Sequence, residues 1–534
     1  MREEADQTGA AIAPFLRWQA WRYLSWGWWE SRLRQPGSKP ELGGPAAILA
    51  LLAVAGAIFV VYAPVLNHYF FGDDFVPLAD VASRSTWGYV ADLFLLRDPT
   101  PNWRLLPGLF YLATFRAFGL EAFPFLLTNV LLHIGTASLI FVLVRRAAGA
   151  FSPAFLAAAF FGLTAAHART IAQVTAFNNA LAAFLLMLSL VTLYEGLARG
   201  RLRWWGVASA LSFAGAIASN ESYAMLAPVP ALLALWKFSD ADGWWRQLRE
   251  WRRLVLLVAP YAAIGGAALI GFGACRCTEA ASVYSLGVVF ENFWIYLGRL
   301  LYPIGLELPG RVGDAHLVAG LAVAALALLM LVRGPALARI CVVFLLLALI
   351  PYLPIEFALA PRYVYLAAIP FSILAALLFA EAAAYGGRIT PLLPPALALV
   401  ALSVLVFYGW QTWSQNEFIA DESAQWRQLV TGLQERYPEL PAGSQVYLRG
   451  GPLALGFSPF VAPPVGEVLW SDVQFRIVAE GAETICARPG GEVFVLDFDA
   501  GRFTPVTAGD PSEPSIGPAV PAIRTDCPPP PFPP

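Results

Sequence analysis

Two adjacent carboxylates follow the first long apolar stretch of the chain. Asp73 and Asp74 stand in HYFFGDDFVPL, directly after an apolar run at 45–66. Neighbouring carboxylates repel each other, which favours a bound cation, a basic ligand or a raised pKa in one of the two. Such a carboxylate could take the proton of an acceptor hydroxyl or hold a hard divalent cation such as Mg²⁺ or Mn²⁺. The alternative is a solvated pair that caps the next helix.

A second group of polar residues lies in HARTIAQVTAFNN. It contains His167, Arg169, Asn178 and Asn179, and it flanks the turn into another apolar run. None of these residues is specific for one chemistry by itself.

Two further motifs place charge beside apolar runs. SNESYAMLAP contains Asn220 and Glu221, and PRYVYLAAIP places Arg362 before Tyr363 and Tyr365. An arginine beside aromatic residues is often an anchor at the membrane interface. It is equally suited to binding a phosphate, because its guanidinium can donate two parallel hydrogen bonds.

Asn129 and His133 lie four residues apart within an apolar run, so they share one face of a helix. Polar residues inside a membrane usually face the interior of the helix bundle. Helix–helix packing is the role we expect for this pair.

The composition indicates which elements must position these groups. Of the 534 residues, 58% are hydrophobic and only 13% are charged, whereas soluble domains carry about 25% charged residues. A bilayer needs roughly 20 mostly apolar residues for each helical span, and long apolar runs account for this composition. The net charge of -2 is nearly neutral and gives no basis for a nucleic-acid partner.

The apolar runs predict an all-α polytopic membrane protein with about eleven transmembrane helices. They lie at 45–66, 121–144, 151–166, 178–195, 204–219, 222–237, 254–274, 315–332, 339–356, 363–385 and 391–412. Two further segments, 103–118 and 286–305, are apolar on one side only, and we expect them to lie along the membrane interface.

The distribution of Lys and Arg predicts the orientation, because cytoplasmic loops are enriched in both. With the N-terminus inside, the inner segments carry 19 of them, against nine on the outer side before the C-terminal region. This orientation places the first loop, 67–120, and all the polar motifs above on the outer face. The Ala, Gly, Leu, Arg and Pro bias is typical of a bacterial chain of high GC content. We therefore expect an inner (plasma) membrane protein whose outer face is periplasmic or extracellular.

Four regions follow from these patterns. Residues 1–44 form a cytoplasmic segment rich in Trp and Arg, 45–413 the transmembrane domain, 414–510 a small extracytoplasmic α/β domain, and 511–534 a Pro-rich tail that is extended or disordered. Within the third region we expect a helix at 417–437 and strands in SQVYLRGG, VLWSDVQFRIV and GEVFVLDFDAGRF. This domain could help to bind an acceptor or cover the site.

The cysteines have no zinc-site spacing. Cys275 and Cys277 are close in sequence, and a disulfide between them would be strained, so we expect two thiols.

The order of these motifs resembles the GT-C superfamily of polyprenyl-phosphate-sugar glycosyltransferases, and in particular its protein O-mannosyltransferase-like branch. The resemblance covers roughly residues 45–385. It consists of the acidic pair and then of NWRLLPGLFYLATFRAFG, FLLTNVLLHIG, HARTIAQVTAF, SNESYAMLAP and RYVYLAAIPF. The sequence departs from the family pattern at Asn220, where the family has a lysine, and at Ala168, where it has a proline.

The resemblance implies a membrane hexosyltransferase. The donor would be a sugar on a polyprenyl monophosphate, and the acceptor a hydroxyl of a protein or glycan on the outer face. Asp73 would be the catalytic base and Asp74 its partner, with a divalent metal a possible ligand of both. Donor and phosphate binding would fall to Arg362, Glu221, Arg169, His167 and Asn179.

Three other functions fit the same setting. A transporter or flippase of lipid-linked glycans would be expected to place its polar residues near the bilayer midplane and to show two similar halves. A polymerase or ligase of lipid-linked glycans, and a catalytically degenerate relative, complete the alternatives.

Overall fold

The computed structural model describes most of the chain. The described residues are 44–95, 104–238, 244–274, 285–303, 314–355, 361–441, 443–450, 462–470, 473–477, 484–486, 492–499, 502–505 and 522–524. The predicted N-terminal segment 1–44, apart from its last residue, lies outside this set, as do Cys275, Cys277 and most of the Pro-rich tail.

The chain forms two compact units. The first comprises Met1–Tyr62, Val130–Thr170 and Asn179–Trp413, and the second comprises Ala63–Asn129, Ile171–Asn178 and Ser414–Pro534. The first loop and the short turn at 171–178 therefore belong to the same unit as the C-terminal region.

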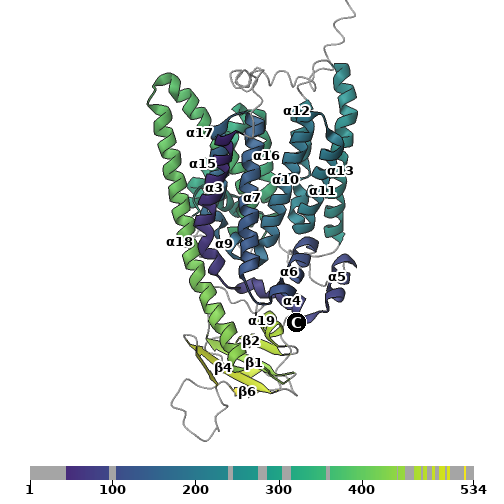
Figure 1. Cartoon of the computed structure of the whole chain (residues 1–534), viewed down its shortest axis with the longest axis vertical. Helices are drawn as coiled ribbons and strands as arrows, with labels where there is room; N and C mark the ends of the chain where they lie inside the picture. The colour runs from purple at the N-terminus through teal and green to yellow at the C-terminus, as the bar shows by residue number, and fades with distance from the viewer. Residues whose placement is uncertain are drawn as a thin grey trace, which may run out of the picture. The chain divides into compact units, whose positions relative to one another are not determined.

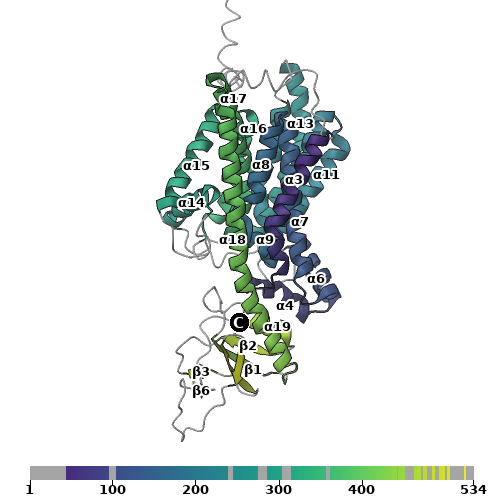
Figure 2. The same ribbon diagram turned by 60° about the vertical axis from the view of Figure 1, so that its left-hand side comes forward.

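The first unit is a bundle of apolar helices that run side by side (Figures 1 and 2). All eleven predicted spans coincide with helices. These helices are α3 (Pro45–Tyr62), α7 (Phe123–Ala148), α8 (Phe151–Leu163), α10 (Phe177–Arg199), α11 (Leu202–Ser219), α12 (Pro228–Phe238), α13 (Trp244–Ala274), α15 (Asp314–Arg333), α16 (Ala336–Leu349), α17 (Tyr365–Ile389) and α18 (Leu393–Arg436).

Length and composition identify membrane spans among these helices. Within the described residues, six helical segments are long and apolar enough to cross a bilayer, or seven if the pair Phe151–Leu163 and Ala165–Ala172, bent by 48°, counts as one span. The predicted multi-pass α-helical membrane protein is therefore confirmed.

Hydrogen bonds between side chains join neighbouring helices of the bundle. Ser209 of α11 makes hydrogen bonds to the Ser189 hydroxyl of α10 at 3.0 Å and to the Tyr261 hydroxyl of α13 at 2.6 Å. Thr412 of α18 donates to the Leu163 carbonyl oxygen of α8 over 2.7 Å. Small hydroxyl residues that bond across helices are typical of packing inside membranes.

Helix α14 (Leu286–Leu301) corresponds to the amphipathic segment predicted at 286–305, and it packs closely on α15. Its buried side includes Ile295 and Tyr296, whereas Leu286 and Phe290 are exposed. Two glycines allow the backbones to approach. A Cβ atom at Gly298 would meet the backbone of His316, and one at Gly320 would lie 2.7 Å from the Trp294 carbonyl oxygen.

Gly298→Ala is therefore expected to destabilise the bundle, because the added methyl group collides with backbone atoms of α15, which cannot rotate away. Overpacking of this kind costs about 1–3 kcal/mol. Thermal unfolding of the purified protein in detergent measures the effect. Gly271→Ala in α13 is the matched control, because no atom lies within 4 Å of a Cβ atom there. Equal melting temperatures for the two variants would contradict the close packing.

The second unit begins with the first loop. This loop contains η1 (Ala63–Asn67), η2 (Gly72–Asp74), α4 (Phe75–Ser83), α5 (Thr86–Leu95) and α6 (Leu105–Phe118). Helix α6 corresponds to the amphipathic segment predicted at 103–118.

The C-terminal helix differs from the prediction. Instead of a separate helix at 417–437, α18 continues without interruption from Leu393 to Arg436, a length of 44 residues (Figure 1). The sequence has no proline between Trp410 and Arg436, and no glycine in the first turns after Trp413, so nothing ends the helix where the composition changes. The change of composition at Trp413 therefore does not mark an end of the helix.

A small sheet follows α18. Strands β1 (Gln445–Gly450), β2 (Gln474–Ile477), β4 (Val493–Asp499) and β5 (Arg502–Pro505) form a sheet of order β2-β1-β4-β5. β1 pairs in parallel with β2 and β4, and β5 is antiparallel to β4. Helix α19 (Ala462–Leu469) connects β1 to β2, as parallel neighbours require.

The strand predictions succeeded in part. The three predicted segments contain β1, β2, β4 and half of β5, but Val468 and Leu469 of the second segment end helix α19. A second pair, β3 (Thr484–Cys486) with β6 (Ala522–Arg524), places a short strand within the segment predicted to be the Pro-rich tail.

Candidate functional site

The turn at Gly72 gives the two predicted acids opposite environments. Gly72 has a φ of +56°, a left-handed conformation that favours glycine. Asp73, the next residue, is exposed, whereas Asp74 is completely buried. Of the two carboxylates, Asp73 is therefore the one that an external substrate can reach.

Asp74 binds two stretches of backbone together within the second unit. One carboxylate oxygen accepts from the Thr175 backbone N–H at 2.8 Å and from the Thr175 hydroxyl at 3.1 Å. The other accepts from the Phe71 N–H at 3.2 Å. Burial nevertheless raises the pKa of Asp74 from 3.8 to about 7, because the cost of desolvating the carboxylate outweighs these donors.

The raised pKa predicts a dependence of stability on pH. Between pH 4 and about 7 the folded protein holds a proton on Asp74 that the unfolded chain has lost, so the contribution of Asp74 to stability falls as pH rises through this window and is constant above it. The shift corresponds to about 4 kcal/mol across the window.

Thermal unfolding from pH 4 to pH 8 tests this expectation. We expect Asp74→Asn to remove this contribution to the slope, because an amide does not titrate. An unchanged slope in the variant would contradict the assignment of the titrating group.

The hydrogen bonds of Asp74 also bear on the predicted metal. Both of its oxygens already accept from protein donors, and the side chain has no exposed surface. Asp74 therefore does not fit a metal site shared with Asp73. Within the described part of the chain there is no group of three or more His, Cys, Asp or Glu residues that could hold a metal ion. The predicted Mg²⁺ or Mn²⁺ stays an expectation for Asp73 alone.

The turn that contains Thr175 is fixed from two more sides. The Asn129 amide donates to the Ile171 and Gln173 carbonyl oxygens at 3.2 and 3.1 Å. The Tyr111 hydroxyl donates to the Val174 carbonyl oxygen at 3.2 Å. Asn129 thus supplies partners for carbonyl groups that the break between α9 (Ala168–Ala172) and α10 leaves outside a helix.

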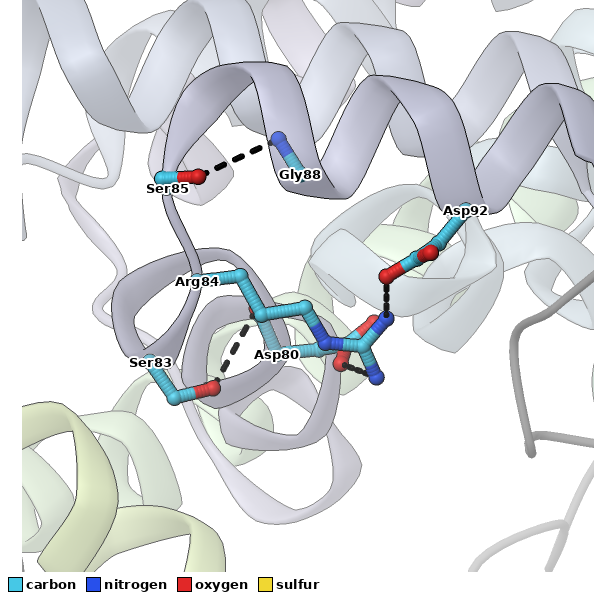
Figure 3. A network of polar contacts seen from close by, with 6 residues as sticks. All are labelled: Asp80, Ser83, Arg84, Ser85, Gly88 and Asp92. Atoms are coloured by element: carbon cyan, nitrogen blue, oxygen red, sulfur yellow. Dashed lines mark hydrogen bonds and ion pairs between the residues drawn. The ribbon is translucent and has the colours of Figure 1, made fainter.

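Ion pairs and hydrogen bonds at the corner between α4 and α5 stabilise the conformation of the first loop. The Arg84 guanidinium contacts the Asp80 carboxylate at 2.6 Å and that of Asp92 at 3.5 Å (Figure 3). The Ser85 hydroxyl accepts from the Gly88 N–H at 3.1 Å and caps the first turn of α5. The Arg116 guanidinium of α6 donates to the Val81 and Arg84 carbonyl oxygens at 3.1 and 2.6 Å.

Arg362 lies in the first unit, in η8 (Pro361–Val364), and it is partly exposed. Its guanidinium carbon is 5.8 Å from the centre of the Tyr363 ring. That ring stacks on Tyr352 with centroids 4.7 Å apart and meets Tyr296 edge-on at 6.3 Å. The aromatic stack fixes the backbone that carries Arg362.

His167 and Tyr365 belong to a buried cluster in the same unit, where η3 (Ala165–His167) contacts η8. The His167 ring lies 4.5 Å from that of Tyr365, 4.7 Å from Phe161 and 5.2 Å from His133. His133 forms hydrogen bonds with the Tyr365 hydroxyl at 2.9 Å and the Gly162 carbonyl oxygen at 3.1 Å. Because a carbonyl oxygen can only accept, the His133 Nε2 atom that faces Gly162 must carry a proton and donate. Accordingly, His133 connects α7, α8 and α17, in agreement with the packing role expected for it.

Asn179 and Asn220 form a direct pair. The Asn220 amide donates to the Asn179 side-chain oxygen at 2.8 Å, and its own oxygen accepts from the Ser222 N–H at 3.0 Å. Asn220 thus begins η5 (Glu221–Leu226) as its N-cap. Asn220 therefore has a structural role, and Glu221 directly follows it, partly exposed.

The predicted site residues divide by their exposure. Arg169, Glu221 and Arg362 are partly exposed and accessible to a ligand, whereas His167 and Asn179 are buried. The sequence analysis did not single out Thr175 or Tyr111. Their hydrogen bonds join segments 63 or more residues apart in the chain, and no local pattern reports such pairings.

The described fold is that of a polytopic α-helical membrane protein with a small α/β region at its C-terminal end. No protein-family model matches the chain, and no curated protein matches it. Several solved structures are similar to it, among them two in complex with a lipid phosphate. The first is ArnT from Cupriavidus metallidurans, bound to undecaprenyl phosphate, with a TM-score of 0.45 and 14% identity over 82% of this chain and 87% of that chain.

The second is the archaeal oligosaccharyltransferase AglB from Archaeoglobus fulgidus, in complex with an inhibitory peptide and a dolichol-phosphate. Its TM-score is 0.47 at 10% identity, over 81% of this chain and 64% of that chain. Because both TM-scores are below 0.5, we base the functional proposal on the residues of this chain.

Proposed function

We propose that this protein transfers a sugar from a polyprenyl-phosphate donor to a hydroxyl acceptor at the membrane surface. The observation that carries the proposal is the acidic turn of the first loop. In this turn Gly72 has a left-handed conformation and Asp73 is exposed to solvent. The hydrogen bonds of the buried Asp74 fix the conformation of the turn. The order of motifs that resembles the GT-C superfamily supports the same assignment.

The proposed reaction needs one base and one positive group. The acceptor oxygen attacks the anomeric carbon of the sugar and forms the new glycosidic bond. The bond between that carbon and the phosphate oxygen breaks, and its electron pair leaves with the polyprenyl phosphate. Asp73 takes the proton of the acceptor hydroxyl, and Arg362 binds the phosphate and offsets the charge that develops on it.

The partly exposed residues have supporting roles in this proposal. Arg169 adds positive charge for the donor phosphate, and Glu221 binds the donor sugar. His167 and Asn179 are buried, so we assign them the positioning of the turns that carry Arg169, Arg362 and Glu221. A hexose on the donor and a protein or glycan as acceptor are the substrate classes that we propose.

We further propose that the reaction occurs on the outer side of the inner (plasma) membrane, with the N-terminus in the cytoplasm. The excess of Lys and Arg in the segments assigned to the inner side supports this orientation. The α/β region that follows α18 would then lie on the outer side, together with Asp73.

An assay in nanodiscs tests the proposal against transport. Both leaflets are accessible in a nanodisc, so a flippase leaves the donor chemically unchanged there. Purified protein is incubated with radiolabelled polyprenyl-phosphate hexoses and a hydroxyl acceptor, which can be water, and lipid and sugar products are separated. We expect free polyprenyl phosphate to appear with time. Measurable donor binding with every donor intact would favour the transporter or the degenerate relative.

A further inference from the structure

The backbone of the acidic loop is fixed by the C-terminal helix. Between η1 and η2 the residues His68–Phe71 have no regular secondary structure, so their buried backbone groups need partners from elsewhere. The partners of the Tyr69 N–H and the His68 carbonyl group come from the part of α18 beyond Trp413, which belongs to the same compact unit as the loop. We propose that Ser423 and Arg427 are positioning residues that set the conformation of the loop bearing Asp73.

Hydrogen bonds from α18 reach the backbone of three consecutive residues of the loop. The buried Ser423 hydroxyl accepts from the Tyr69 backbone N–H at 2.8 Å. The Arg427 guanidinium donates to the Asn67 carbonyl oxygen at 2.9 Å and to that of His68 at 3.3 Å. A serine and an arginine one turn apart on α18 thus bind three successive residues at the start of the loop.

Ring contacts reinforce the same attachment. Trp426, which is 2% exposed, packs on the Phe75 ring at 5.3 Å, immediately after the acidic pair. The Arg427 guanidinium carbon lies 5.5 Å from the centre of the Tyr69 ring. Asp73 therefore stands between two points at which α18 contacts the loop, Tyr69 before it and Phe75 after it.

The attachment assigns a role to the C-terminal extension of α18. The part of α18 beyond Trp413 is regular helix, so its contacts give the loop a fixed support within the second unit. A catalytic base must be held close to its productive geometry, since small displacements cost large factors in rate. The inference thus deepens the proposed function, on which its catalytic part depends.

Two variants remove the contacts without adding volume. Ser423→Ala leaves the Tyr69 N–H without its acceptor, and Arg427→Ala leaves two carbonyl groups without their donor. Arg427→Lys is the conservative variant, because an ammonium group can still donate to both carbonyl oxygens. Gln428→Ala, at an exposed position on the same helix, is the matched control.

Hydrogen exchange and kinetics are measured on the full-length protein in nanodiscs. For Ser423→Ala we expect exchange across residues 68–75 to rise about tenfold, which corresponds to the loss of one hydrogen bond to a buried group. For Arg427→Ala we expect a smaller rise, because its hydrogen bonds lie nearer the surface. We also expect kcat for sugar transfer to fall about tenfold, with the donor KM unchanged. Arg427→Lys should restore most of kcat, and Gln428→Ala should match wild type in both measurements.

The two measurements separate the possible failures. Unchanged exchange across residues 68–75 in both alanine variants would overturn the support by α18, whatever the activity. Raised exchange with an unchanged kcat would overturn the positioning role. If wild type transfers no sugar from any donor, the proposed function fails, while exchange still decides whether α18 fixes the loop. Thermal unfolding of each variant tests whether a fall in kcat results from unfolded protein.

Discussion

Asp73→Asn is expected to lower the rate of sugar transfer by about 10²- to 10⁴-fold, the usual contribution of a general base. The amide keeps the size and exposure of the side chain but cannot take the acceptor proton. Donor affinity should not change, because the carboxylate acts on the acceptor. Initial rates at saturating donor and equilibrium binding of the donor, both in nanodiscs, measure the two effects.

A control from the same loop separates catalysis from general electrostatics. Asp92→Asn removes one negative charge from α5, while Arg84 keeps its ion pair with Asp80 at 2.6 Å. This variant should retain the wild-type rate. An equal loss in both variants would show that loop charge, and not a base at residue 73, determines the rate.

Arg362→Gln is expected to weaken donor binding by about 10- to 150-fold, the effect of losing a charge-assisted hydrogen bond worth about 1.5–3 kcal/mol. The rate at saturating donor should fall as well, since the same charge offsets the phosphate charge that develops as the bond breaks. Arg362→Lys should recover part of the affinity but not all of it, because an ammonium group lacks the paired donors of a guanidinium.

Arg388→Gln is the control for this prediction. Arg388 is an exposed residue near the other end of α17, the helix that follows Arg362. Its replacement removes the same charge and should leave donor affinity unchanged. Similar donor affinities for Arg362→Gln and Arg388→Gln would remove Arg362 from the phosphate site.

The membrane helices could be predicted because their signal is local. Each span needs an uninterrupted apolar stretch, and the runs at 45–66 and 363–385 coincide with α3 and α17. The end of α18 could not be predicted in this way. Its residues change from apolar to mixed at Trp413, but helical hydrogen bonding continues there because no proline interrupts it before Arg436.

The residue types of the site could be predicted from the sequence, but not which of the two acids is exposed and which is buried. The pair Asp73 and Asp74 is visible as two neighbouring acids, yet sequence alone does not tell which of them is buried. The structure makes that distinction through Gly72 and Thr175, because the first turns the backbone and the second binds Asp74 from a segment 101 residues away. Contacts at such separation depend on the tertiary fold.

The support of the loop by α18 was likewise beyond sequence reasoning. Ser423 and Arg427 lie more than 350 residues from the backbone groups that they bind, and both look like ordinary polar residues of a surface helix. The C-terminal region was expected either to bind an acceptor or to cover the site. Its helix in fact contacts the loop that carries the predicted base.

The central claim is that Asp73 and Arg362 serve one sugar-transfer reaction. The most direct test is mass spectrometry of the lipid after wild type, Asp73→Asn and Arg362→Gln are incubated side by side with the same polyprenyl-phosphate hexose. Polyprenyl phosphate should form with wild type and fall by at least tenfold with either variant. Equal amounts of polyprenyl phosphate in all three reactions would contradict the account.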